Sequence, residues 1–255
     1  MLLVVARTPP ASQSQAFIEA ARLTGLSPAD VRTRLAGPLP RVLHIEPDGD
    51  RARELAAELE GAGFAVLVCE PRAAPGDDER LQARGLRLAG GILTVIDGAG
   101  GEEELPLSAL SLIQRGTRTT TSTEVTKKTE RRLDVTRALL TGGLMLTKKV
   151  EKKTTRTTTA RESFLLLHRG DGERDVMVYE RRLDYRFLGA DLQPASAANF
   201  DRLLARLRAA APRVPFDDRV NRPGFLSGLP AASSATVDLA LWLVHLVHLR
   251  GWAGT

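Results

Sequence analysis

Residues 115–161 read RGTRTTTSTEVTKKTERRLDVTRALLTGGLMLTKKVEKKTTRTTTAR. Two runs rich in threonine and basic residues flank a short apolar centre. The segment contains 13 Lys and Arg against 4 Asp and Glu, so it carries +9, whereas the whole chain carries +5. The remaining residues therefore sum to −4, and this single segment makes the protein basic.

The flanking runs 118–128 and 154–161 are predicted to be β-strands, because threonine favours extended structure and pairs well across strands. Threonine or a charged residue occupies both faces of each run, whereas the strands of a sheet buried on one side would alternate apolar and polar residues. The two runs resemble each other, which favours antiparallel partners that extend past the core as a ribbon. A short helix, capped by Asp134 and ended by glycines 142 and 143, is expected between them.

The basic residues of this ribbon are the candidate surface for binding a partner. Lysine and arginine also protect an exposed strand edge from pairing with other chains, so a purely structural role is the alternative. As a binding surface they would hold an acidic protein or the phosphates of a nucleic acid. Because 115–161 contains no aromatic residue, a nucleic acid would be bound through its backbone. Edge-to-edge self-assembly is a third interpretation. The candidate residues are Lys127, Lys128, Arg131, Arg132, Lys148, Lys149, Lys152, Lys153 and Arg156.

Residues 1–71 predict the order β-α-α-β-α-β. Each expected helix has an N-cap residue at its start, and glycines at its end stop it. The second helix also begins with proline, which suits the first helical turn. The expected strands are 2–6, 41–46 and 64–69, and the expected helices begin at Ser12 or Ser14, at Ser27 and at Asp48.

Within this order, TGL at 24–26 ends the first helix, Gly37 ends the second, and ELEGAG at 58–63 precedes the last strand. With these residues the order resembles the C-terminal domain of the bacterial ribosomal stalk protein, whose fold is similar to that of the Clp protease adaptor. In the stalk family, lysines on the first helices contact translation GTPases. Arg32 matches one such position, whereas Ile18, Ala21 and Ala29 replace others, so the resemblance implies the fold rather than the role. A response-regulator receiver, with Glu46 and Asp48 in its acidic cluster, is the alternative, but too few α/β units follow.

Residues 72–84 (RAAPGDDERLQAR) are rich in proline, glycine and charge, and they predict a linker. The pattern then becomes strand-like, and residues 85–212 resemble bacterial pleckstrin-homology or GRAM-like small barrels in architecture. We therefore expect an α+β protein whose second domain is a β-rich small barrel or curved sheet carrying the ribbon. Its expected strands are 86–88, 92–96, 104–107, 163–168, 175–179 and 181–188, and its closing helix is 196–210.

Residues 213–255 are expected to be irregular up to a helix over 237–250. That helix is apolar nearly all round, so it must be buried against this chain, a second subunit or a partner. Core packing is the default interpretation. An oligomer interface is the alternative, and it would be formed by Leu239, Trp242, Leu243 and Leu246.

The sequence offers no catalytic pattern. His245 and His248 stand three residues apart on the expected helix and could hold a metal with Asp238, but no HExxH or CxxC motif supports this. No phosphate-cradling loop and no Ser-His-Asp arrangement is visible. The single cysteine, Cys69, excludes an internal disulfide. We therefore expect no enzyme, no cofactor and no metal.

The bulk composition indicates a globular protein, with 43% hydrophobic and 26% charged residues. Neither a signal peptide nor an apolar run of membrane-spanning length is present, which predicts a cytoplasmic location. The expected function is that of a non-catalytic adaptor or scaffold that binds a protein partner or self-associates. The alternative is a nucleic-acid- or ribosome-associated protein that binds through the ribbon. No small-molecule substrate is evident.

Overall fold

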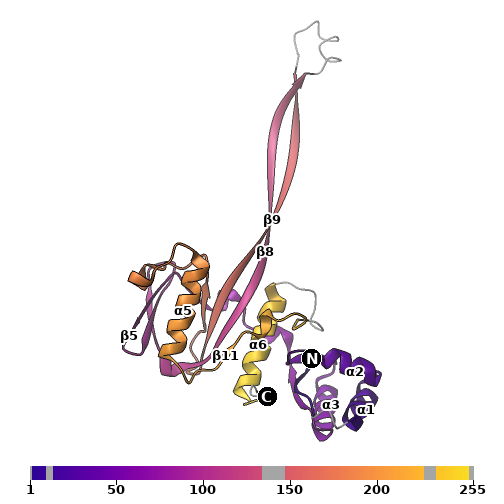
Figure 1. Cartoon of the computed structure of the whole chain (residues 1–255). Helices are drawn as coiled ribbons and strands as arrows, with labels where there is room; N and C mark the ends of the chain where they lie inside the picture. Colours follow the sequence, from indigo (N-terminus) through magenta and orange to yellow (C-terminus); the bar gives the residue numbers. More distant parts are fainter. Residues whose placement is uncertain (1, 10–13, 134–146, 227–233, 253–255) are drawn as a thin grey trace. The chain divides into compact units, whose positions relative to one another are not determined.

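A computed structural model describes residues 2–9, 14–133, 147–226 and 234–252 of the chain (Figure 1). These residues divide into two compact units. The first unit runs to Arg118 and resumes at Glu162, and the second unit is 119–161. The short helix predicted after Asp134 lies outside the described residues. No helix within the described ranges is long and apolar enough to cross a membrane.

The first unit begins with the predicted β-α-α-β-α-β order. Ser27 accepts a hydrogen bond from the backbone N–H of Asp30, and Asp48 caps its helix in the same way. Gly25, with φ of +70°, ends the first helix in a conformation that favours glycine. The elements are β1 (Leu2–Arg7), α1 (Ser14–Thr24), α2 (Pro28–Leu35), β2 (Arg41–Ile45), α3 (Gly49–Gly61) and β3 (Ala65–Cys69).

These strands form an antiparallel sheet of order β2-β1-β3 that is covered on both faces. Alternate side chains point to opposite faces of a strand. On one face, Leu43 and Val66 pack against α1, α2 and α3. On the other face, Val42 and Leu67 pack against α6 (Ser234–Leu249).

A five-stranded sheet of order β11-β8-β9-β10-β4 forms the centre of the rest of the first unit. Its outer strands, β11 and β4, have a neighbour on one side only, so the sheet is open. Among the described strands the predicted small barrel is therefore wrong, and the curved-sheet alternative is right. The strands are β4 (Leu81–Ala83), β8 (Leu110–Leu133), β9 (Thr147–Arg169), β10 (Val176–Tyr179) and β11 (Phe216–Asp217).

The predicted meander over 85–107 forms its own antiparallel sheet. Together with α5 (Ser196–Ala210), which has the predicted bounds, it covers one face of the five-stranded sheet. Leu93, Leu165 and Phe200 are fully buried in the shared core. The strands of the meander are β5 (Gly85–Ala89), β6 (Ile92–Ile96) and β7 (Glu102–Pro106).

Helix α6 covers the opposite face of the five-stranded sheet. Its Leu241 packs against Phe164 of β9, and its Val244 packs against Leu112 of β8. Because α6 also contacts the sheet β2-β1-β3, it is buried on two sides. This explains why its sequence is apolar nearly all round.

Two segments differ from their predictions. Residues 72–84 are not a linker, because they supply β4, which pairs with β10, and the buried Arg80. Residues 181–188 are not a strand, because they form turns that lead into a short 3-10 helix, Arg186–Asp191. Leu183 and Tyr185 are buried at alternate positions, which gives a strand-like pattern to a segment that forms turns.

Candidate functional site

The predicted basic surface lies on β8 and β9, which are hydrogen-bonded neighbours. Its four β8 residues lie within 127–132, directly before β8 ends at Leu133, and four of its β9 residues lie within 148–153, directly after β9 begins at Thr147. Both sets are therefore at the same level of the paired strands. The two ranges hold eight basic residues and two acidic ones, Glu130 and Glu151, over a strand length of about 20 Å. The net charge of the two ranges is +6, which favours an anionic partner.

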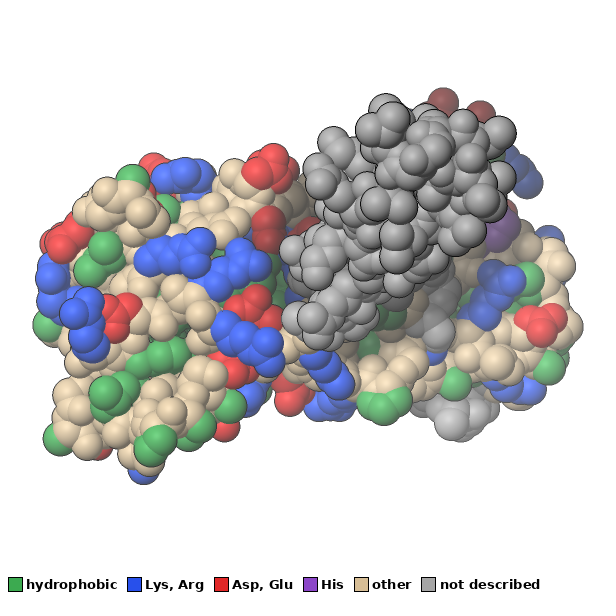
Figure 2. All heavy atoms as spheres, turned by 90° about the horizontal axis from the view of Figure 1, so that it is seen from above, with side chains coloured by type: hydrophobic (Ala, Val, Ile, Leu, Met, Phe, Trp, Pro, Cys, Tyr) green, Lys and Arg blue, Asp and Glu red, His purple; other side chains and the backbone are tan. Residues whose placement is uncertain are grey.

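All six lysines of the chain are in these two sets, at positions 127, 128, 148, 149, 152 and 153. Every other basic residue is an arginine. This distribution is visible in the sequence, and it marks the ribbon as chemically distinct from the rest of the chain. On the face of the molecule shown in Figure 2, the described basic and acidic side chains are interspersed rather than segregated by sign.

A buried charge cluster lies where β8 leaves the first unit. The Asp238 carboxylate accepts hydrogen bonds from Arg118 at 2.7 Å and from Arg80 at 2.6 Å. Arg118 and the Tyr179 hydroxyl also donate to Asp77. Burial, followed by this bond to Asp77, raises the pKa of Tyr179 above its ordinary value. The cluster joins the 72–84 segment, β8, β10 and α6, and sequence reasoning missed it.

A histidine cluster lies between α6 and the five-stranded sheet. Nδ1 of His168 is 2.6 Å from Oδ2 of Asp175, and its Nε2 is 2.6 Å from Oε1 of Gln114. Gln114 in turn donates its Nε2 hydrogen to the carbonyl of Leu241 at 3.2 Å. The ring of His245 stacks on that of His168, with centroids 3.9 Å apart.

The histidine pair considered from the sequence, His245 and His248, is not brought together with Asp238. His248 instead contacts Asp217, with 3.0 Å between Nε2 and Oδ2, and Arg219 also donates to Asp217. Burial acts to raise the pKa of Asp217, but the hydrogen bonds from His248 and Arg219 outweigh it and lower the pKa to about 2.

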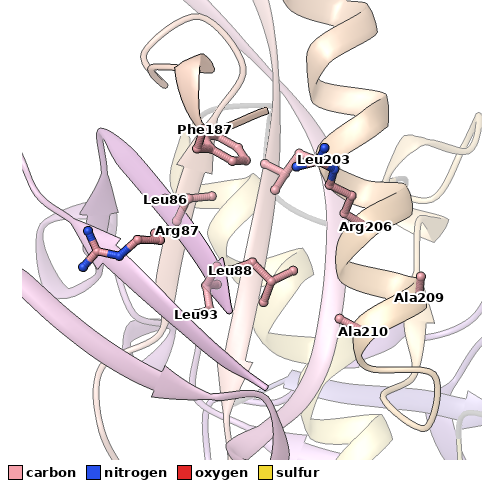
Figure 3. A pocket seen from close by; sticks show the side chains of 9 residues that line it. All are labelled: Leu86, Arg87, Leu88, Leu93, Phe187, Leu203, Arg206, Ala209 and Ala210. Atoms are coloured by element: carbon pink, nitrogen blue, oxygen red, sulfur yellow. The ribbon is translucent and has the colours of Figure 1, made fainter. Parts of the chain in front are cut away.

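An apolar cavity of about 440 Å³ lies between the β5–β6 hairpin and α5 (Figure 3). Leu86, Leu88 and Leu203 point into it, whereas Arg87 points away. Arg206 lies at the rim of the cavity and donates a hydrogen bond to the Asp191 carboxylate at 2.5 Å, so the charge of Arg206 is already paired.

The predicted interface residues of α6 are covered by the chain itself. Leu239 and Leu243 are buried, and they pack together with the partly buried Trp242 and Leu246 against Val42, Leu67 and Cys69 of the N-terminal sheet. The core-packing interpretation is therefore the one that the structure shows.

No family model, curated protein or solved structure matches this chain. The resemblance of residues 1–71 to the stalk-protein domain stays a prediction, alongside the observed β-α-α-β-α-β order.

Proposed function

We propose that this chain is a binding protein of the adaptor or scaffold class, and that its basic ribbon holds an acidic protein partner. The observation that carries the proposal is the placement of two lysine-rich sets at one level of two paired strands. Edge protection alone would be served by charges spaced along the strands, whereas these two ranges concentrate a net charge of +6. An anionic partner would neutralise that charge.

The strand edges favour a protein partner. Within the first unit, β8 pairs with β11 at 113–114, and β9 pairs with β10 at 164–167. Neither of these pairings extends into 119–133 or 147–161. An extended acidic segment could therefore add to an edge by main-chain hydrogen bonds while its carboxylates meet the lysines.

A nucleic acid is the second candidate, and the shape of the ribbon favours it. The major groove of DNA admits a two-stranded β-ribbon. The 15 residues of β8 in the second unit, 119–133, would extend about 50 Å. If the ribbon contacts about eight phosphates, raising the salt concentration from about 50 to about 200 mM should lower its affinity for DNA by roughly 10³–10⁵.

The lysine distribution allows a selective test without mutagenesis. Acetylation removes lysine charge, whereas reductive methylation keeps it, and both act on the ribbon and the α-amino group. Unmodified, acetylated and methylated proteins are titrated at low salt with poly-glutamate peptide and with mixed-sequence duplex DNA. We expect acetylation to abolish peptide binding and methylation to preserve it.

The outcome of these titrations identifies the ligand of the basic ribbon. Binding of DNA but not of peptide, lost on acetylation, would select the nucleic-acid function. If neither probe binds the unmodified protein at low salt, or if acetylation changes nothing, the proposal is wrong. Light scattering of the three forms at low and high salt separates self-association from partner binding.

A further inference from the structure

Three side chains with metal-binding atoms converge on the face of the five-stranded sheet that α6 covers. His168 lies near the end of β9, Asp175 directly precedes β10, and His245 is on α6. One nitrogen or oxygen atom from each lies within 4.8 Å of the corresponding atoms of the other two. Ser111 of β8 borders the cluster, with its Oγ 3.5 Å from Nε2 of His245.

The hydrogen bonds around His168 select its tautomer. Gln114 donates to the carbonyl of Leu241, so its Oε1 faces His168 and must accept the hydrogen of Nε2. The lone pair of Nδ1 then faces the Asp175 carboxylate, and only a cation between them, a proton or a metal ion, makes this contact favourable. Orientation of a ligating histidine through its other ring nitrogen is the usual outer-shell arrangement of metal sites.

Metals bind the neutral imidazole and the ionised carboxylate. A metal ion at this place would therefore take the position of the proton between Nδ1 of His168 and Oδ2 of Asp175.

We propose that His168, Asp175 and His245 bind one divalent metal ion of the zinc type. Two imidazole nitrogens and a carboxylate oxygen suit Zn²⁺, with bond lengths of about 2.0–2.2 Å. Ligand atoms on one tetrahedral ion are about 3.4 Å apart. On binding, the contact between His168 and Asp175 would therefore lengthen from 2.6 Å, and the His245 ring would turn out of its stack on His168 so that a nitrogen of each ring faces the ion.

The ion would fasten α6 to the sheet that it covers. His168 and Asp175 belong to the β9–β10 hairpin, whereas His245 comes from the helix. Metal that binds only the folded chain raises the folded-to-unfolded ratio about 100-fold at a free concentration of 100 times its dissociation constant. For a chain of this size we expect the Tm to rise by roughly 5–10 °C.

The test uses full-length protein without a histidine tag, stripped with chelator and dialysed. Zinc binding is measured by titration calorimetry, zinc content by mass spectrometry, and Tm with and without Zn²⁺. His245→Gln and Asp175→Asn remove one ligand each, and His248→Gln is the matched control one helical turn away. We expect one ion per wild-type chain, a raised Tm for wild type and the control, and no zinc effect on the ligand variants.

Co²⁺ gives an independent readout. In the wild type it should show the visible absorption of a tetrahedral nitrogen–oxygen site, and neither ligand variant should show it. The proposal is overturned if the wild type binds no zinc, or if both ligand variants bind it as tightly as the control. Should both variants fail to fold, hydrogen exchange of the wild type decides: slower exchange in 164–179 and 234–249 with Zn²⁺ supports the site, and unchanged exchange refutes it.

Discussion

Asp238→Asn should destabilise this protein far more than an ordinary surface substitution. The carboxylate is 9% exposed and accepts hydrogen bonds from two buried guanidinium groups, those of Arg80 and Arg118. The asparagine leaves both cations without this counter-charge. Removing one partner of a buried ion pair costs about 3–5 kcal/mol. Because Asp77 still contacts both arginines, we expect about 3 kcal/mol.

The matched control is Asp201→Asn, because Asp201 is 60% exposed and pairs with Arg115 at 2.8 Å. A surface pair of this kind contributes about 0–1 kcal/mol. Urea unfolding at neutral pH measures both losses. Tryptophan fluorescence is a suitable probe, because Trp242 and Trp252 both pack in the cluster between α6 and the N-terminal sheet. If the two variants lose the same free energy, the buried cluster does not stabilise the fold as argued.

Three further predictions concern the first unit. Gly116→Ala should cost about 1–3 kcal/mol, because the added Cβ would overlap the ring of Phe164, and thermal unfolding checks this. Leu243→Ala should cost about 2–5 kcal/mol in urea. The same change at Leu249, which is 62% exposed, should cost about 0.5 kcal/mol or less. Asp217 has a pKa of about 2 in the folded chain against an ordinary value of 3.8. Its ionised form therefore contributes about 2 kcal/mol to the free energy of unfolding above pH 3.8, and this contribution is lost as the pH falls toward 2. The free-energy difference between Asp217→Asn and wild type should therefore shrink over that range in acid denaturation.

Local signals predicted the helices and strands well. Proline at the start of α2, the Asp48 cap of α3 and the apolar spacing of α5 each depend on residues close in the chain. The ribbon pairing was likewise predictable, because the two threonine-rich runs resemble each other. The α+β class follows from these elements alone.

The errors arose where distant residues decide the structure. Asp77 and Arg80 gave 72–84 the composition of a linker, yet they pair with Arg118 and Asp238, which are far along the chain. The histidine cluster likewise unites β9 and α6. One signal was available: His245 is a polar residue within an apolar helix, so burial would require a polar partner.

The position of α6 bears on how the chain is synthesised. This helix is translated after every strand that it covers, so Val42 and Leu67 on one sheet, and Leu112 and Phe164 on the other, are made long before their cover. A nascent chain that has not reached residue 234 thus carries two apolar sheet faces in contact with water. Such faces promote aggregation of incomplete chains. We therefore expect a chain that ends before residue 234 to aggregate more readily than the full chain.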